Sequence, residues 1–98
     1  METNKNGLGS YFKRFLGEPI AVLCCRYWYR GIVAEVLDDS VILSNPYAVE
    51  VMGPAAGARV ETEDRIPSDI CILFQAAEIV MRPAWAFYGY ETKKEEGK

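Results

Sequence analysis

The feature that most constrains this 98-residue chain is the apolar stretch from Pro19 to Glu50. It is rich in Ile, Val, Leu, Cys, Tyr and Trp, the residue types that suit a pleated, half-buried surface. Gly31 and the polar cluster Asp38-Asp39-Ser40 interrupt it at positions suited to bending and turning a sheet. The stretch predicts three consecutive antiparallel strands, a meander that needs further strands or a partner to be stable.

One short helix and two more strands are predicted around this meander. Ser10 is a suitable N-cap for a helix over Tyr11–Leu16, which Gly17 ends and Pro19 prevents from continuing. One face of this helix is apolar, so it must pack across the sheet. The five strands are expected at Ile20–Cys25, Trp28–Leu37, Val41–Val51, Ser68–Phe74 and Glu78–Arg82, with Pro46 marking an edge or a bulge in the third.

The expected organisation is a single domain over residues 10–90, with a flexible lead at 1–9 and a disordered charged tail at 91–98. Met52–Pro67 is predicted to be an exposed loop. Its acidic part, Glu61–Asp64, is expected to be a solvated face that could also repel nucleic acid or receive a basic partner. The aromatic segment Trp85–Tyr90 is expected to fold back on the sheet or to pack across a subunit contact; a peptide- or base-stacking surface is the alternative.

Composition limits the function classes. The chain has 11 Lys and Arg against 14 Asp and Glu, a net charge of −3, so nucleic-acid binding would have to depend on a local patch. It has no histidine, and no metal-spaced ligands or nucleophile–base pair, so neither an enzyme nor a metal or cofactor is expected. Neighbouring carboxylates such as Asp38 and Asp39 are usually turn formers.

Three cysteines, of which Cys24 and Cys25 are adjacent, do not form a disulfide framework, because neighbours on a strand point to opposite faces. Free cysteines are typical of a reducing cytosol. No signal peptide is visible, and no apolar run approaches the roughly 20 residues that span a bilayer. The sequence therefore predicts a soluble, cytoplasmic protein.

Several stretches occur in the order seen in a known family. The run Leu37–Leu43 resembles the first motif of the Sm/LSm family, particularly its bacterial Hfq version. Tyr11–Val22 looks like the helix-to-strand junction of that family, Gly31 falls where the family bends its second strand, and Ile72–Val80 is similar in shape to the second motif. The resemblance covers most of residues 10–83 and implies a strongly bent five-stranded antiparallel barrel after a short helix.

The residues that read RNA in that family are not carried over. The family recognises uridine-rich RNA with an aromatic residue and an Asn in the first motif, where this chain has Ser40 and no Asn after Val41. In the second motif the family places Arg-Gly, or Lys-His in Hfq, where this chain has Gln75-Ala76. The resemblance thus implies the location of a pocket at Asp39, Ser40 and Gln75, whose polar groups could contact a base edge.

The segment Arg26-Tyr27-Trp28-Tyr29-Arg30 interleaves basic and aromatic residues. Strand alternation places Arg26, Trp28 and Arg30 on one side, where arginines could hold phosphates while Trp28 stacks on a base. The alternative is that these side chains pack in the core or against a neighbouring subunit, where Tyr, Trp and Arg are enriched.

Two functions follow as expectations from the resemblance and these residues. The first is a ring-forming Sm-like module that binds single-stranded RNA or DNA; the second is a structural or protein-interaction module that has kept the ring and lost RNA binding. The ring would be a homo-oligomer joined through the strands at Ile70–Phe74 and Ile79–Arg82, which would remove two exposed strand edges. A monomeric small barrel of another kind, such as an SH3-like adaptor, is the third possibility.

Overall fold

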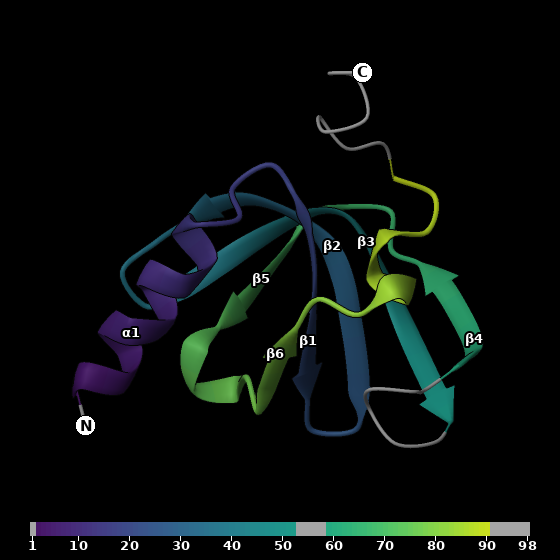
Figure 1. Ribbon diagram of the computed structural model, residues 1–98, viewed down its shortest axis with the longest axis horizontal. Coiled ribbons are helices and arrows are strands. Elements are labelled where there is room, and N and C mark those ends of the chain that lie inside the picture. Colours follow the sequence, from purple (N-terminus) through teal and green to yellow (C-terminus); the bar gives the residue numbers. More distant parts are fainter. Residues whose placement is uncertain (1, 53–58, 91–98) are drawn as a thin grey trace.

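The computed structural model describes residues 2–52 and 59–90. Within these residues a helix leads into six strands, and two short 3-10 helices interrupt the second half of the chain (Figure 1). In chain order the elements are α1 (Glu2–Lys13), β1 (Pro19–Cys24), β2 (Tyr27–Val36), β3 (Ser40–Met52), β4 (Arg59–Arg65), β5 (Ile70–Leu73), η2 (Phe74–Ala76), β6 (Ile79–Met81) and η3 (Ala84–Phe87). The predicted class, mainly β with an N-terminal helix, is confirmed.

All strand pairs are antiparallel, in the order β4-β3-β2-β1-β6. β5 joins through β3, which pairs with β5 over Ser40–Leu43 and with β4 over Tyr47–Met52. β4 and β5 therefore follow one another along the same edge of β3. β6 lies at the opposite edge of the sheet, next to β1.

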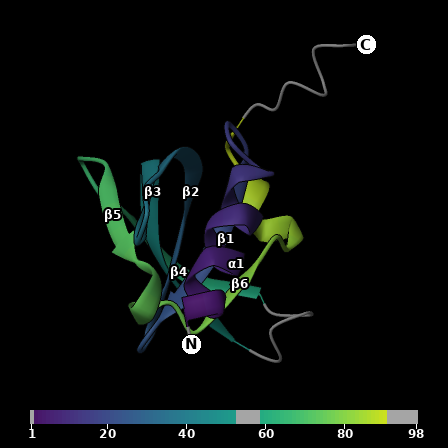
Figure 2. The same ribbon diagram turned by 90° about the vertical axis from the view of Figure 1, so that its left-hand side faces the viewer.

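The bent sheet does not close into a barrel, and it has six strands where five are predicted, because the predicted loop Met52–Pro67 contains β4. β5 and β6 are not paired and lie apart in the view of Figure 2. The link between them is tied at each end to a different part of the sheet. Phe74 N–H donates a hydrogen bond of 2.9 Å to the carbonyl of Asp39, and Glu78 N–H donates one of 2.8 Å to the carbonyl of Leu23.

Gly31 bends β2, as predicted. The register between β2 and β3 shifts there, with Arg30 opposite Tyr47 and Ile32 opposite Ser44, so that β3 carries an extra residue. A Cβ at position 31 would lie 2.9 Å from the Cβ of Leu43, a distance that packed side chains do not tolerate. The bulge predicted at Pro46 is also confirmed, because the extra residue of β3 lies between Ser44 and Tyr47. The absence of a side chain at Gly31 lets this bulged backbone approach β2.

Both faces of the sheet are buried, in two hydrophobic clusters. The first lies under α1, and Figure 1 shows the helix at one end of the molecule. The second lies under the segment that follows β6, where Trp85 and Ala86 are buried. The members of the first are Phe12, Ile20, Val22, Val33, Val41, Leu43, Ile72 and Phe74, and those of the second are Ala21, Trp28, Val49, Trp85 and Ala86. The aromatic segment Trp85–Tyr90 is expected either to fold back on the sheet or to pack across a subunit contact. Folding back is confirmed for Trp85 and Ala86.

Three predicted boundaries are wrong. The helix begins at Glu2, so Ser10 lies inside it, where the Phe74 ring packs beside Gly9. The first hairpin turns at Cys25-Arg26, with Cys25 in the left-handed region at φ 61°. The predicted loop Met52–Pro67 contains β4, whose backbone pairs with β3 although its side chains lack apolar alternation. Residues 53–58 of that loop and the predicted tail 91–98 lie outside the described residues.

Candidate functional site

The six residues singled out in the sequence lie at two separate places. Asp39, Ser40 and Gln75 come together where the turn between β2 and β3 meets η2, since Ser40 pairs with Leu73 and the Asp39 carbonyl accepts the hydrogen bond from Phe74. Asp39 and Gln75 are exposed, whereas Ser40 is buried. This place therefore offers one carboxylate and one amide to a ligand.

Trp28 and Arg30 lie at the start of β2, and Arg26 lies in the turn just before it. Trp28 and Arg30 share one face, as alternation predicts, but both are buried, and only Arg26 is exposed. The Trp28 ring meets the Trp85 ring edge to face, with centroids 5.5 Å apart. Of the two interpretations of this segment, packing in the core holds for Trp28 and Arg30.

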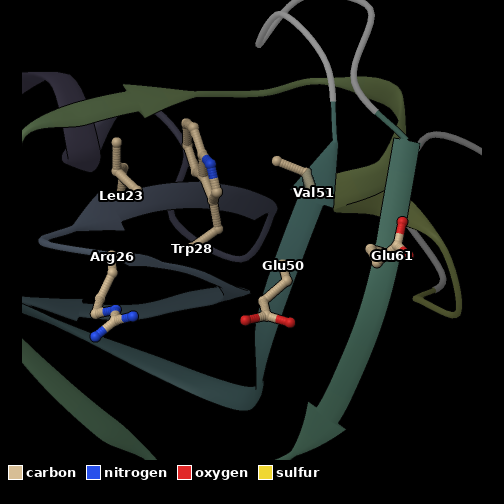
Figure 3. Close-up of a pocket in the computed structure, with 6 residues that line it drawn as sticks. All are labelled: Leu23, Arg26, Trp28, Glu50, Val51 and Glu61. Atoms are coloured by element: carbon tan, nitrogen blue, oxygen red, sulfur yellow. The ribbon is translucent and has the colours of Figure 1, made fainter.

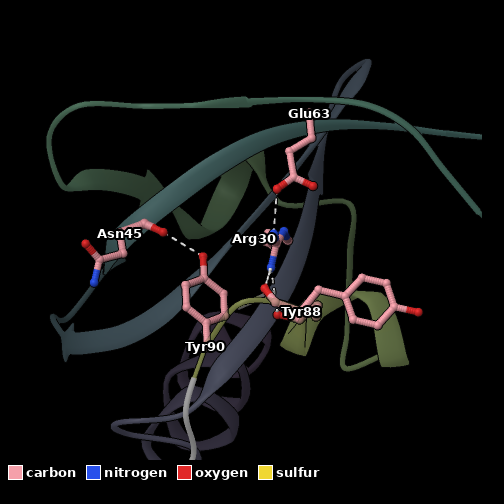
Figure 4. A network of polar contacts seen from close by, with 6 residues as sticks. Arg30, Asn45, Glu63, Tyr88 and Tyr90 are labelled. Carbon is pink, nitrogen blue, oxygen red and sulfur yellow. Dashed lines mark hydrogen bonds and ion pairs between the residues drawn. The ribbon is translucent and has the colours of Figure 1, made fainter.

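Arg30 is the centre of a polar network that holds the segment 83–90, here called the C-terminal strap, against the sheet (Figure 4). Its guanidinium donates hydrogen bonds of 2.6 Å to the Tyr88 carbonyl and 3.4 Å to the Ala86 carbonyl. It also forms an ion pair of 2.6 Å with Glu63 on β4. Because the Arg30 side chain is only 3% exposed, these partners replace part of the water that its charge would otherwise require, while its buried Nε has no hydrogen-bond partner among the described residues.

Two tyrosine rings enclose the same guanidinium. Its central carbon lies 4.4 Å from the centroid of Tyr47 and 5.0 Å from that of Tyr90, distances at which a cation is attracted to a ring face. Tyr90 in turn donates a hydrogen bond of 2.6 Å from its hydroxyl to the Asn45 carbonyl at the bulge (Figure 4). The basic–aromatic pattern of the sequence thus forms an internal clasp.

Burial raises the pKa of Tyr90 to about 12 from an ordinary value of 10.0, against the lowering effect of the Arg30 charge. The folded protein therefore favours the neutral phenol. The stabilising contribution of Tyr90 is complete below pH 10.0 and is lost as the pH rises toward about 12, because the unfolded chain ionises first.

The first prediction is that the tyrosinate absorbance of the folded protein contains one component with a midpoint near pH 12 that Tyr90→Phe removes. The measurement is an ultraviolet titration of both proteins, with circular dichroism at each pH to confirm that they remain folded. A difference curve with its midpoint at the ordinary value of 10.0 would contradict an effect of the partial burial of Tyr90 on its pKa.

A second arginine fastens β6 to the junction between helix and sheet. Arg82 forms an ion pair of 2.6 Å with Glu18 and donates from Nε to the Pro19 carbonyl over 3.2 Å. Its guanidinium lies over the rings of Phe15, at 4.2 Å, and Phe87, at 4.9 Å. These contacts join the end of β6 to both the connection between α1 and β1 and the strap.

Within residues 2–52 and 59–90, the sheet has three open stretches of edge, on β4, β5 and β6. β4 is covered by charged side chains, which discourage pairing with another strand. β5 and β6 instead expose large apolar residues, with Leu73 46% and Ile79 43% exposed. Edges of this kind are suited to pairing with another chain.

A cavity of about 470 Å³ lies beside β5 and is mostly apolar. Its lining residues are Cys24, Tyr29, Ile66, Ile70, Cys71, Ile72, Leu73 and Ala76. Burial raises the pKa of the Cys24 thiol, and the nearby Glu78 adds to this effect, so the thiol stays protonated and unreactive. This cavity therefore offers an apolar contact surface.

No local pattern in the sequence predicts the ion pair that organises the strap, because Glu63 is expected in a solvated loop. Arg30 is separated from Glu63 by 33 residues along the chain. It is separated from the strap residues Ala86 and Tyr88, whose carbonyls it also contacts, by 56 and 58 residues. The open edge of β5 was foreseen, since the strand itself was predicted. The exposed apolar residue on this edge, Leu73, could have been found from its place in the predicted strand Ser68–Phe74.

A comparison of the sequence with protein-family models and with curated proteins gives no match. Within residues 2–52 and 59–90, no helix is both long and apolar enough to cross a membrane. The same residues contain no group of three or more Cys, Asp or Glu side chains placed to hold a metal ion.

Proposed function

We propose that this protein is a non-enzymatic, Sm-like assembly module whose copies join head to tail through the open edges of β5 and β6. The observation that carries the proposal is the pair of unpaired edges, each with a large exposed apolar residue. Strand addition would satisfy the free backbone groups of both edges and cover Leu73 and Ile79. A heterologous contact of this kind repeats from copy to copy and closes into a ring where the rotation permits.

The acidic composition and the burial of Trp28, Arg30 and Ser40 favour protein contacts over nucleic acid for the main surface. The three free cysteines fit a reducing compartment, and we place the module in the cytoplasm.

The second prediction concerns assembly, measured by size-exclusion chromatography with light scattering. The wild-type protein is expected to have a mass several times that of the 11.0 kDa chain. Leu73→Lys and Ile79→Lys are each expected to reduce it to a single copy, because a lysine on an edge strand opposes pairing. Leu16→Lys is the matched control, since Leu16 is 51% exposed in the connection between α1 and β1 and lies on neither edge strand.

Mixing the two edge variants tests the head-to-tail arrangement directly. Leu73→Lys keeps an intact β6 edge and Ile79→Lys an intact β5 edge, so the mixture is expected to form dimers and nothing larger. A wild-type protein that stays at 11.0 kDa at every concentration would overturn the proposal. Variants that keep the wild-type mass would overturn the assignment to these edges.

Single-stranded RNA binding is the second candidate, favoured by the proximity of exposed Asp39 and Gln75. A side-chain amide can donate to and accept from a base edge. The third prediction is salt-sensitive binding of uridine- or adenine-rich oligonucleotides at micromolar protein, measured by fluorescence anisotropy and weakened about threefold or more by Gln75→Ala. The control is Glu35→Gln, which changes an exposed residue on β2, outside the place where Asp39 and Gln75 lie. Absence of salt-sensitive binding would remove this candidate.

A further inference from the structure

A notch opens at the end of the sheet that carries the β1–β2 turn. The pairing of β2 with β3 ends at Trp28 and Val49, while β3 continues to Met52 beside β4 alone. The overhanging end of β3 and the turn enclose a cavity of about 300 Å³ (Figure 3). Its lining residues are Leu23, Arg26, Trp28, Glu50, Val51 and Glu61.

The lining divides into an apolar part and a charged part. Figure 3 shows Leu23, Trp28 and Val51 on one side of the notch, and the side chains of Arg26 and Glu50 directed to the other. Among the described residues, no ion pair joins Arg26 to either carboxylate of the cavity. Charges of opposite sign therefore line one small space without neutralising each other.

The two carboxylates that line the cavity come from neighbouring strands, Glu50 from β3 and Glu61 from β4. Glu50 lies opposite Thr62, whose hydroxyl donates a hydrogen bond of 2.9 Å to Oε1 of Glu50 and leaves the second oxygen free for a ligand. The register between β3 and β4 shifts next to this pair, so that Glu61 is the extra residue of a bulge. Bulges redirect side chains, and this one places Glu61 in the lining of the cavity, on the strand next to that of Glu50 (Figure 3).

We propose that this notch binds a free α-amino acid with an apolar side chain. The ammonium group would bind the Glu50 carboxylate in the space that Glu61 also lines, and the carboxylate would accept hydrogen bonds from the fork of the Arg26 guanidinium. The side chain would pack on Trp28, Leu23 and Val51. The cavity volume of about 300 Å³ is at the small end of ligand sites and suits a ligand of this size.

Other small ligands fit the charge pattern less well. An anion would meet two carboxylates, and a cation would meet Arg26, so each would add a repulsive contact. An uncharged apolar molecule would leave all three charged groups without partners and would partly desolvate them. A zwitterion satisfies both signs at once.

The test is a titration of the full chain with L-leucine, followed by calorimetry and by tryptophan fluorescence, since Trp28 lines the cavity. Leucine is expected to bind, and N-acetyl-leucine and leucinamide, which lack one charge each, to bind about tenfold more weakly or not at all. Absence of binding up to the solubility limit of leucine would overturn the proposal. Equal affinity of leucine and either analogue would also overturn it.

Substitutions test which residues contact the ligand. Arg26→Gln and Glu50→Gln are each expected to weaken leucine binding about tenfold. Arg14→Gln and Glu35→Gln, which change exposed residues outside the cavity, are expected to leave it unchanged. Thermal melts of all four variants separate loss of binding from loss of fold. Binding that survives both cavity substitutions in folded protein would contradict the proposal, whatever the result for assembly.

Discussion

Arg30→Met is expected to lower the free energy of unfolding by about 3–5 kcal/mol, the cost of removing one partner from a buried ion pair. The substitution keeps an apolar stem of similar length but leaves the Glu63 carboxylate without its cation. It also leaves the carbonyls of Ala86 and Tyr88 without a donor. Since Glu63 is 28% exposed, water can compensate part of the loss, and the lower end of the range is expected.

Urea denaturation at a fixed protein concentration measures this effect, because assembly would make stability depend on concentration. For a domain of this size the loss corresponds to a fall in Tm on the order of 15 °C. Arg14→Met, at an exposed arginine, is the control and is expected to change stability by less than about 0.5 kcal/mol.

The double variant Arg30→Met with Glu63→Met separates charge from packing. Removing both partners leaves no unpaired charge, so the double variant is expected to be more stable than Arg30→Met alone. A loss below about 1 kcal/mol for Arg30→Met would contradict the view that this network holds the strap in place.

The parts of the fold that could be predicted depend on local signals. β1, β2 and β3 are runs of apolar and β-branched residues separated by turn residues, and Gly31 marked the bend because a strand interior otherwise disfavours glycine. β4 could not be predicted in the same way. It is held by backbone pairing with β3 and carries charged side chains, so its sequence resembles that of a solvated loop.

Local sequence patterns are also insufficient to predict which residues of the candidate site are exposed. Interleaved arginines and aromatic residues would be expected both of an RNA-binding surface and of a buried cation enclosed by rings. What separates the two is whether another part of the chain covers them. For Arg30 that cover is supplied by the strap, 56 to 58 residues further along, which no local pattern reveals. Arg26, at the open end of the same segment, stays exposed and lines the notch.

The role of α1 leads to the fifth prediction, that Phe12→Ala lowers the free energy of unfolding by about 3–5 kcal/mol. Phe12 is completely buried and its ring stacks on Phe74 at 5.7 Å, so the helix is anchored to the link between β5 and β6. Leu16, just after the end of α1, is 51% exposed, and Leu16→Ala is the control in the same urea titration. Because truncation leaves a cavity that the surrounding sheet can fill only in part, Phe12→Leu should recover most of the loss. Equal effects at positions 12 and 16 would contradict this anchoring role.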